Sequence, residues 1–354
     1  MSICITGSGS YIPGTIKKNK DFLSNKFLNS DGTTFNVSNE VIIKKFHSIT
    51  GIKERRYAKN EYNASDLASF AAKNAIKDSK IDQETLDYII VAHNFGDVKF
   101  GTKQSDSLPS LANRVKYSLG IKNPDCVCYD LIFGCPGWLE GVIQAQAFIK
   151  AGMAKKCLVI GAETLSRTID INDRDSMIYS DGAGATIIEE KAKISNTGIL
   201  SHKSCSFSSE ETFYLFFGES FNSKEESKDH YIKMYGHKIY EFALTHVPLA
   251  LKSCLEDSGK SIKDVKKVFL HQANEKMDEA IVNRFYKLYD LTPPNNVMPM
   301  SIEKLGNSSV ATIPTLYDLV KKNKLKNHNI KKGDIILFGS VGAGMNVNAI
   351  TYQV

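Results

Sequence analysis

The sequence lacks the features of a membrane or secreted protein. None of its 354 residues falls in an apolar run near the roughly 18 residues that a membrane-spanning helix needs. Its first residues, MSICITGSGSYIPG, have neither the charged start nor the long apolar core of a signal peptide. We therefore expect a cytoplasmic protein without a membrane partner.

The sequence has only a small excess of charge of one sign. It holds 45 Lys and Arg against 39 Asp and Glu, a formal net charge of +6. No block of basic residues with interleaved aromatics is present, which argues against a nucleic-acid partner. The most basic stretch, KKNKLKNHNIKK at 321–332, is interpreted as a solvated loop. A mildly basic face can still bind an acidic protein.

Cysteines are few, and their number is odd. Seven cysteines scattered over a long chain argue against a disulfide framework and for a reducing compartment. Cys126 and Cys128 are two residues apart, but no second pair of ligands stands at the spacing of a zinc site. We expect no metal site. Structural roles are predicted for Cys4, Cys157, Cys205 and Cys254.

Apolar runs alternate with segments of helical periodicity, which is the pattern of an α/β fold. Helices are predicted at 64–79 and 138–152, where apolar residues recur at helical spacing. Strands are predicted at 86–94, 126–134, 155–163, 184–190, 265–274 and 333–344.

The second half repeats this plan, because VKKVFLHQAN (265–274) corresponds to DYIIVAHN and GDIILFGSVGAG to KKCLVIGAE. We expect an internal duplication into halves 1–195 and 196–354. The polar segment 206–230 is predicted to be a surface excursion between the halves that can lie over a site. The glycines of GAET, SDGAGA and GSVGAG predict close backbone approaches where the halves meet.

Cys135, in LIFGCPGWLEG, is the first candidate for chemistry. Gly134 permits a sharp turn after a strand, and Pro136 suits the first position of a following helix. The sulfur would then lie at a helix N-terminus, where the dipole favours the thiolate. Free cysteines are more often small buried hydrophobes, but this placement favours a reactive thiol.

A thiol nucleophile needs a base, or donors that stabilise the charge formed on its substrate. His271, in FLHQAN, is predicted at the carboxyl edge of the sheet, but His93 ends the corresponding strand of the first half. Asn307, in GNSS, is either a third polar group or a helix cap. The glycine loop 339–346 is either a plain turn or a source of backbone N–H donors.

Taken together, these stretches resemble the 3-oxoacyl-[acyl-carrier-protein] synthase III family, ketosynthases of the thiolase superfamily. The order and spacing of Cys135, His271 and Asn307 are those of the Cys-His-Asn set of that family. The likeness covers nearly the whole chain, including GSGSYIPG, TGIKERRYA, DLIFGCPGW, SRTIDINDRDSMIYSDGAGATII, FLHQAN and LGNSS.

The resemblance implies an α/β fold, the duplicated thiolase fold of five layers, αβαβα, in a homodimer. It also implies an acyltransferase in which Cys135 takes an acyl group. His271 and Asn307 would then stabilise the enolate formed from malonyl-[acyl-carrier protein], in a decarboxylative Claisen condensation. Acyl carrier protein is the implied partner. No resident cofactor is implied, because coenzyme A or carrier-protein thioesters are substrates.

Several substrate contacts follow from the same resemblance. The backbone of Cys135 and of the loop Gly342, Ala343 and Gly344 would form the oxyanion hole for acyl transfer. Leu108 matches the loop residue that enters the acyl pocket of the partner subunit. A flexible leucine there could admit a longer primer.

The kind of donor thioester is predicted from the residues that hold the adenine of coenzyme A in the family, which this chain matches only in part. Arg174 matches one arginine that holds the adenine of coenzyme A, whereas Lys45 and Ile49 stand where the family has tryptophan and arginine. Half a clamp favours an acyl carrier protein as donor. Lys276 and Arg284 are candidate docking residues for that acidic protein, or else ordinary solvated charges.

Two other functions stay open. One is a specialised ketosynthase resembling the dialkylresorcinol-forming (aryl polyene or flexirubin-type) branch, which joins two carrier-bound acyl chains. The unusual GCPGW and GAGMN loops favour that branch. The other is a non-catalytic ketosynthase-like subunit, which retention of Cys135, His271 and Asn307 disfavours. The sequence leaves acyl chain length and pathway undecided.

Overall fold

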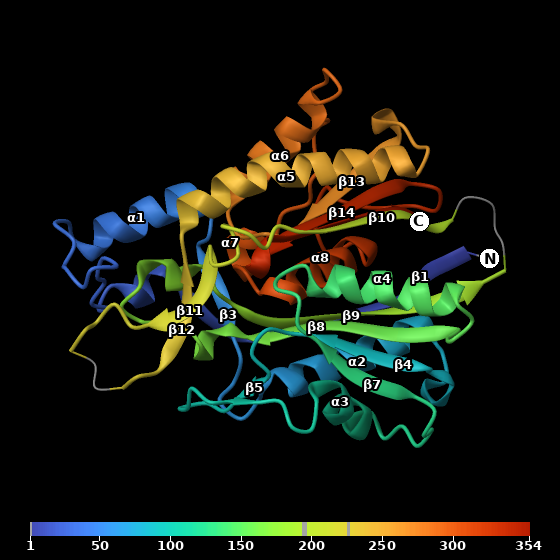
Figure 1. The fold of residues 1–354 in the computed structure, drawn as a ribbon, viewed down its shortest axis with the longest axis horizontal. Helices are drawn as coiled ribbons and strands as arrows, with labels where there is room; N and C mark the ends of the chain where they lie inside the picture. Colours follow the sequence, from blue (N-terminus) through green and yellow to red (C-terminus); the bar gives the residue numbers. More distant parts are fainter. Residues whose placement is uncertain (1, 193–196, 225–226) are drawn as a thin grey trace.

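Two main sheets, with helices between and around them, form the centre of the molecule (Figure 1). The computed structural model describes residues 2–192, 197–224 and 227–354. The five-stranded sheet has the order β1 (Ser2–Tyr11), β9 (Asp181–Lys191), β8 (Lys156–Thr164), β4 (Tyr88–Ala92) and β7 (Val127–Leu131). The four-stranded sheet has the order β10 (Gly198–Ser206), β15 (Asn346–Gln353), β14 (Ile335–Gly342) and β13 (Val265–Leu270).

The helices complete five layers, αβαβα, as predicted (Figure 1). The outer layer on the first sheet holds α2 (Ala64–Ser79) and α3 (Leu111–Leu119). The central layer holds α4 (Gly137–Lys150) and α8 (Thr312–Lys321), and both contact the first sheet and the second. The outer layer on the second sheet holds α5 (Gly236–Asp257), with α6 (Glu275–Lys287) packed on it.

The two sheets share a pairing pattern. In the first, β4 pairs parallel with β8, and β8 pairs antiparallel with β9. In the second, β13 pairs parallel with β14, and β14 pairs antiparallel with β15. Each sheet draws its strands from one side of the segment 193–196, and the boundary expected at 195–196 lies outside the described residues.

The predicted elements are present with altered ends. The helix at 64–79 matches α2, and the helix at 138–152 matches α4. Each predicted strand corresponds to one in the structure, but β13 ends at Leu270, so His271 lies in the loop after the strand. Several elements were not predicted, among them α3, β10 and β15 and, near the N-terminus, β1, β2 (Thr15–Lys18), β3 (Glu54–Tyr57) and α1 (Asn39–Thr50).

The segment expected to be a surface excursion is largely an ordered hairpin. β11 (Leu215–Glu219) pairs antiparallel with β12 (His230–Met234), although residues 225–226 lie outside the described part of the chain. The buried ammonium of Lys233 lies 2.6 Å from Asp170 and 3.3 Å from Asp173, which anchors β12 to the body of the protein. A buried charge paired in this way resists separation, because either partner left alone would be desolvated without compensation.

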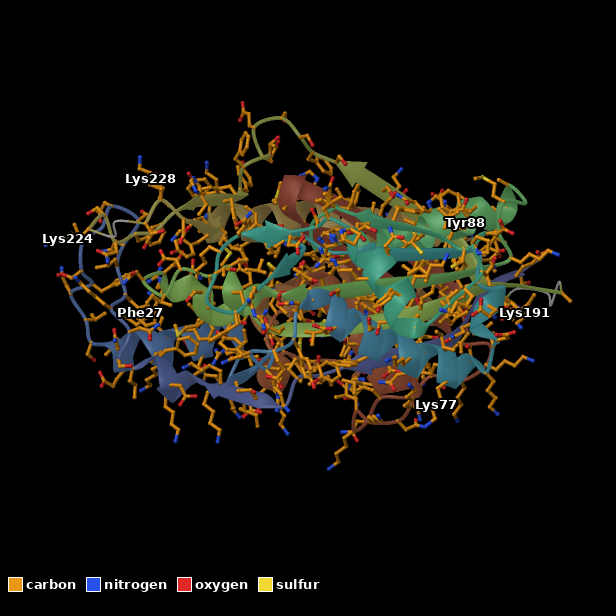
Figure 2. All side chains as sticks on the ribbon, turned by 90° about the horizontal axis from the view of Figure 1, so that it is seen from below. Phe27, Lys77, Tyr88, Lys191, Lys224 and Lys228 are labelled. Carbon is orange, nitrogen blue, oxygen red and sulfur yellow. The ribbon has the colours of Figure 1, made fainter. Side chains whose placement is uncertain are left out.

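The excess of positive charge is spread over the surface. Lys77, Lys191 and Lys224 are exposed, and they project from well-separated parts of the molecule (Figure 2). Among the described residues, no helix combines the length and apolar character needed to cross a bilayer.

Glycines let the two halves touch at their backbones. A Cβ placed on Gly161, in β8, would lie 2.2 Å from the carbonyl oxygen of Val310, and one on Gly184, in β9, would lie 2.7 Å from the backbone nitrogen of Thr315. Both distances are far below van der Waals contact. The close approaches predicted from GAET and SDGAGA are therefore confirmed.

Replacing Gly161 with Ala is expected to lower the free energy of unfolding by about 1–3 kcal/mol or more, because the added methyl group overlaps the Val310 backbone. Gly14→Ala is the matched control, since a Cβ there meets nothing within 4 Å. Thermal unfolding followed by circular dichroism measures both. Equal melting temperatures for the two variants would contradict the close packing at Gly161.

Candidate active site

Cys135 lies in a tight turn between β7 and α4. Gly134 has φ of +66°, in the left-handed region that favours glycine, and a Cβ on it would lie 2.7 Å from the backbone nitrogen of Ala343. The helix begins at Gly137, and Pro136 occupies the cap position, one residue earlier than the sequence suggested. The sequence of this turn thus places the sulfur against the glycine loop of the other half.

The glycine loop packs directly on the backbone of Cys135. A Cβ on Gly342 would lie 2.4 Å from the backbone nitrogen of Cys135, so only glycine leaves space beside that N–H. The loop continues through Ala343 and Gly344, which has φ of +74°. The amide of Asn346 donates to the carbonyl of Ala343 over 2.9 Å and fixes the turn.

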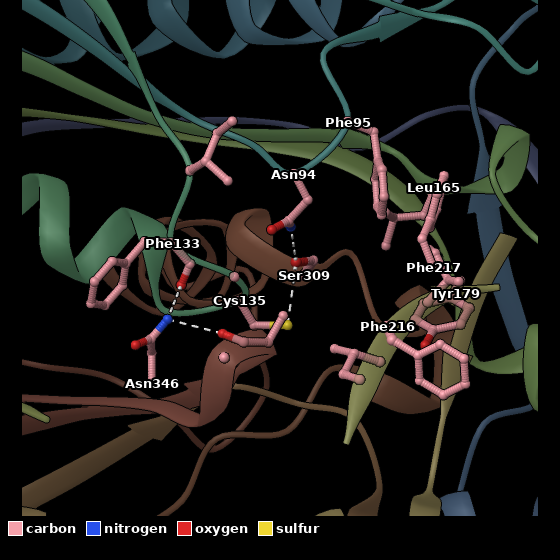
Figure 3. Close-up of a pocket in the computed structure, with 16 residues that line it drawn as sticks. Asn94, Phe95, Phe133, Cys135, Leu165, Tyr179, Phe216, Phe217, Ser309 and Asn346 are labelled. Carbon is pink, nitrogen blue, oxygen red and sulfur yellow. Dashed lines mark hydrogen bonds between the residues drawn. The ribbon is translucent and has the colours of Figure 1, made fainter. Parts of the chain in front are cut away.

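Cys135 opens into an apolar cavity of about 370 Å³ (Figure 3). Phe216 and Phe217 of the hairpin form part of its wall, and Phe217 stacks on Phe95 with ring centroids 4.9 Å apart. The ordered hairpin therefore encloses the space next to the sulfur. The other lining residues come from both halves: Asn94, Ile132, Phe133, Gly134, Leu165, Tyr179, Leu215, Ile232, Ser309, Ala343, Gly344 and Asn346.

The surroundings of Cys135 do not favour the thiolate at neutral pH. Burial raises the pKa of its thiol to about 11, although a hydrogen bond from Ser309 opposes the increase. The expectation that the helix N-terminus would stabilise the thiolate is wrong for the free protein. Loss of water around the sulfur has a larger effect on its pKa than the hydrogen bonds from Ser309 and from the Cys135 backbone.

His271 is held at the end of β13 by its backbone, whose N–H donates to the carbonyl of Gly339 over 2.9 Å. Its ring is buried, and burial lowers the pKa of the imidazole to about 4, against a hydrogen bond with the Ser309 backbone. The ring is therefore neutral at physiological pH. Within residues 2–192, 197–224 and 227–354, its Nδ1 atom has no hydrogen-bond partner.

His93, the competing histidine, has a structural environment. Its Nε2 atom lies 3.0 Å from the Asp130 carboxylate, and its Nδ1 atom accepts the backbone N–H of Gly96 over 2.9 Å. Both ring nitrogens are thus engaged within the first half. None of His93, His271 and Asn307 lines the Cys135 cavity, so the engaged ring nitrogens, and not the cavity lining, distinguish His93 from His271.

Asn307 lies in a short turn well before α8 begins at Thr312, so it does not cap that helix. Its backbone bonds to the segment before β9, donating to Ile178 over 3.0 Å and accepting from Ser180 over 2.8 Å. Its side-chain oxygen accepts the backbone N–H of Ser309 over 2.7 Å. Among the residues that the structure describes, no hydrogen bond engages the amide nitrogen of Asn307.

Ser309 connects the three predicted residues, and sequence reasoning missed it. Its hydroxyl lies 3.3 Å from the sulfur of Cys135, and its backbone bonds to both Asn307 and His271. The hydroxyl also accepts from the amide of Asn94 over 3.0 Å (Figure 3). Its position two residues after Asn307, in LGNSS, was the only feature of the sequence that could have indicated a role for Ser309 in the site.

Of the predicted site residues, Cys135, Ala343 and Gly344 line this cavity, and the predicted substrate and docking residues Leu108, Arg174, Lys276 and Arg284 do not. Arg174 stacks on Phe35 with its guanidinium carbon 5.0 Å from the ring centroid, in a second cavity of about 720 Å³ that Lys45 and Ile49 also line. Leu108 is 89% exposed. Lys276 is exposed on α6, and Arg284 on the same helix donates to the carbonyl of Leu244 over 3.2 Å. The described part of the chain has no group of three metal-ligating side chains.

Comparison with known proteins places the whole chain in one family. Residues 129–206 match the family described as 3-oxoacyl-[acyl-carrier-protein (ACP)] synthase III, and residues 255–354 match its C-terminal part. The beta-ketoacyl-[acyl-carrier-protein] synthase III of Porphyra purpurea is 31% identical and is aligned over 100% of this chain and 99% of its own. The same enzyme of Caldanaerobacter subterraneus subsp. tengcongensis is 34% identical over 96% of this chain and 94% of its own.

A solved structure agrees with these relatives. The crystal structure of 3-oxoacyl-[acyl-carrier-protein] synthase III from Aquifex aeolicus superposes with a TM-score of 0.79 at 30% identity, covering 99% of this chain and 100% of that one. The thiolase fold and the family are therefore shown independently of the motifs.

Alkylation of Cys135 by iodoacetamide is expected to be slow at pH 7 and to rise about tenfold per pH unit up to pH 10, because the thiolate fraction follows a pKa of about 11. Mass spectrometry of the peptide that contains Cys135 measures the rate. In urea-unfolded protein the thiol regains its ordinary pKa of 9.0, so alkylation at pH 8 should be faster there. A plateau of the native rate below pH 9 would contradict the burial effect.

Proposed function

This chain belongs to the 3-oxoacyl-[acyl-carrier-protein] synthase III family, whose members are acyl-transferring ketosynthases, and from that membership we propose its reaction. The reaction is a decarboxylative Claisen condensation of an acyl group on Cys135 with malonyl-[acyl-carrier protein]. One observation carries the proposal: the sulfur of Cys135 faces an apolar cavity and connects through Ser309 to both His271 and Asn307.

In the first step, the sulfur of Cys135 forms a bond to the acyl carbon of a donor thioester. The bond from that carbon to the donor sulfur breaks, and the donor leaves as a thiol with the proton of Cys135. The backbone N–H of Cys135 and the adjoining loop at Ala343 would stabilise the oxyanion, since preorganised donors act strongly in a dry site. The apolar cavity of about 370 Å³ would hold the acyl chain.

In the second step, the malonyl carboxylate leaves as carbon dioxide, and the resulting enolate attacks the acyl carbon on Cys135. The carbon–carbon bond forms, the carbon–sulfur bond breaks, and the sulfur takes a proton from solvent. His271 and the free amide nitrogen of Asn307 would donate to the enolate oxygen. A neutral imidazole suits this role, and the low pKa of His271 keeps it neutral.

We propose an acyl carrier protein rather than coenzyme A as the donor. In the second cavity, Ile49 and Lys45 offer no flat ring or guanidinium for an adenine, and the cation of Arg174 is already stacked on Phe35. The cavity is otherwise largely apolar, which suits an extended arm better than a nucleotide. The same apolar lining favours the alternative in which a second carrier-bound acyl chain is the condensing partner.

We also propose that two copies of the chain associate. β7 is the edge strand of the five-stranded sheet, Val127 on it is 47% exposed, and Leu108 is 89% exposed in the loop before α3. An edge strand with apolar side chains left in water is a surface that natural proteins cover. Leu108 of one copy would then reach the acyl cavity of the other.

His271→Ala and Asn307→Ala are expected to retain acyl loading of Cys135 and to lose condensation by about 100-fold or more, because the enolate loses one donor. Cys135→Ala should lose both steps. Intact-mass measurement of the acyl adduct, with acyl-coenzyme A and acyl-carrier thioesters of several lengths, separates the steps. Loading of acetyl-coenzyme A followed by malonyl condensation would contradict the carrier-protein donor, and turnover by Cys135→Ala would contradict the mechanism.

Lys276→Glu is expected to raise KM for malonyl-carrier protein about tenfold, because the exposed ammonium faces an acidic partner. Lys263→Glu is the matched control, since that exposed lysine precedes β13 and so lies at the opposite end of the strand from His271. KM for a small malonyl-pantetheine thioester should not change in either variant. Equal KM values for the two variants with the carrier protein would exclude Lys276 from docking.

A further inference from the structure

A row of hydrogen-bonded polar groups leads from β8 of the first half to the sulfur of Cys135, and Figure 3 shows its last part, from Asn94 through Ser309 to the sulfur. Glu163 begins it, and one of its carboxyl oxygens accepts both the backbone N–H of Asn94, over 2.9 Å, and the side-chain amide, over 2.5 Å. The same amide nitrogen lies 3.0 Å from the hydroxyl of Ser309, which lies 3.3 Å from the sulfur of Cys135. The family motifs of this chain include Cys135 but neither Glu163 nor Asn94.

The direction of these hydrogen bonds is fixed by chemistry. An amide nitrogen only donates, so the hydroxyl oxygen of Ser309 must accept from Asn94. The hydroxyl proton is then left to donate, and the sulfur of Cys135 is its recorded acceptor. A hydroxyl held in this way stabilises the thiolate more than the thiol, because a hydrogen bond to a charged group is the stronger one.

Asn94 cannot turn its carbonyl oxygen toward Ser309 without loss. Rotation of the amide would place that oxygen against the carboxyl of Glu163, which accepts from both nitrogens of Asn94. Glu163 is 1% exposed, so water would not replace the lost bonds. Glu163 therefore determines which face Asn94 presents to Ser309.

The backbone conformation of Ser309 also helps to direct its hydroxyl toward the sulfur of Cys135. Its φ of +52° is uncommon for a residue other than glycine and carries a steric cost. The conformation is held by the hydrogen bond from its N–H to the side-chain oxygen of Asn307, over 2.7 Å. Its hydroxyl is consequently aimed from a fixed position at the sulfur of Cys135.

We propose that Ser309 donates the hydrogen bond that stabilises the thiolate of Cys135, and that Asn94 and Glu163 are positioning residues that fix the direction of that bond. The bond would act whenever the sulfur carries charge, both when Cys135 attacks the donor thioester and when it leaves the condensed product. The inference rests on the proposed role of Cys135 as acyl acceptor. Its readout is thiol reactivity, which requires no substrate.

The test is the pH dependence of iodoacetamide alkylation at Cys135. In Ser309→Ala the rate at pH 8 should fall about 10- to 100-fold, with the profile shifted to higher pH, as loss of a hydrogen bond to a charged group predicts. Ser308→Ala is the matched control, since its hydroxyl lies 3.4 Å from Thr312 rather than near the sulfur. An unchanged profile in Ser309→Ala would overturn the proposal.

If Ser309→Ala does not fold, the pH profile of Cys135 alkylation can be measured instead in variants of the two positioning residues, Asn94 and Glu163. Asn94→Ala should shift the profile in the same direction, and Glu163→Ala should do so as well. Glu163→Gln should restore at least most of the wild-type rate, because its amide oxygen can still accept from Asn94. If Asn94 and Glu163 had a purely structural role, their variants would have lower melting temperatures and an unchanged pH profile of alkylation. Either that result, or equal alkylation rates in Glu163→Ala and Glu163→Gln, would refute their role as positioning residues.

Failure of this inference can be told apart from failure of the proposed reaction. Acyl loading of Cys135 in wild-type protein, followed by intact mass, tests the reaction alone. If wild-type protein loads and condenses while Ser309→Ala keeps the wild-type alkylation profile, the reaction stands and the role of Ser309 falls. If the profile shifts but no thioester loads, Ser309 acts on the thiol and the proposed reaction falls.

Discussion

The contact between two backbones at Cys135 and Gly342 is the constraint on which the site depends. A Cβ on Gly342 would lie 2.4 Å from the nitrogen of Cys135, and one on Gly134 would lie 2.7 Å from the nitrogen of Ala343. The turn that carries the thiol and the loop that ends β14 can be this close only because neither has a side chain there. Any residue larger than glycine would separate the halves and withdraw the second sheet from the sulfur.

The same contact explains the electrostatics of the site. Packing at backbone distance excludes water, and burial then raises the pKa of the Cys135 thiol and lowers that of the His271 imidazole. Both shifts favour neutral groups. A dry, neutral site suits a reaction in which charge develops briefly on sulfur and on an enolate oxygen, because each donor then acts in a low dielectric. The hydrogen bond from Ser309 lowers the pKa of the Cys135 thiol, but burial raises that pKa by more.

Much of the fold and part of the site could be predicted from the sequence. Apolar periodicity located α2 and α4, and the corresponding strand runs of the two halves predicted the duplication that the shared pairing pattern reflects. Cys135, His271 and Asn307 could be predicted as site residues because their motifs are local, and their roles remain proposals. β1 was missed because its SGSY end breaks the apolar run that would mark a strand. Ser309, Asn94 and Glu163 could not be connected, because they are joined only by hydrogen bonds across more than 60 residues of sequence.

The β11–β12 hairpin shows why the size of the substrate cannot be predicted from the motifs around Cys135, His271 and Asn307. Its Phe216 and Phe217 enclose the cavity next to Cys135, while Lys233 anchors it to Asp170 and Asp173. Arg174, in the second cavity, directly follows Asp173. β12 itself contributes Ile232 to the lining of the Cys135 cavity and Met234 to the lining of the second cavity, on either side of the anchored Lys233. A change in the hairpin that moved Lys233 would therefore alter the lining of both cavities together, through a residue that touches neither the sulfur nor the polar groups around it.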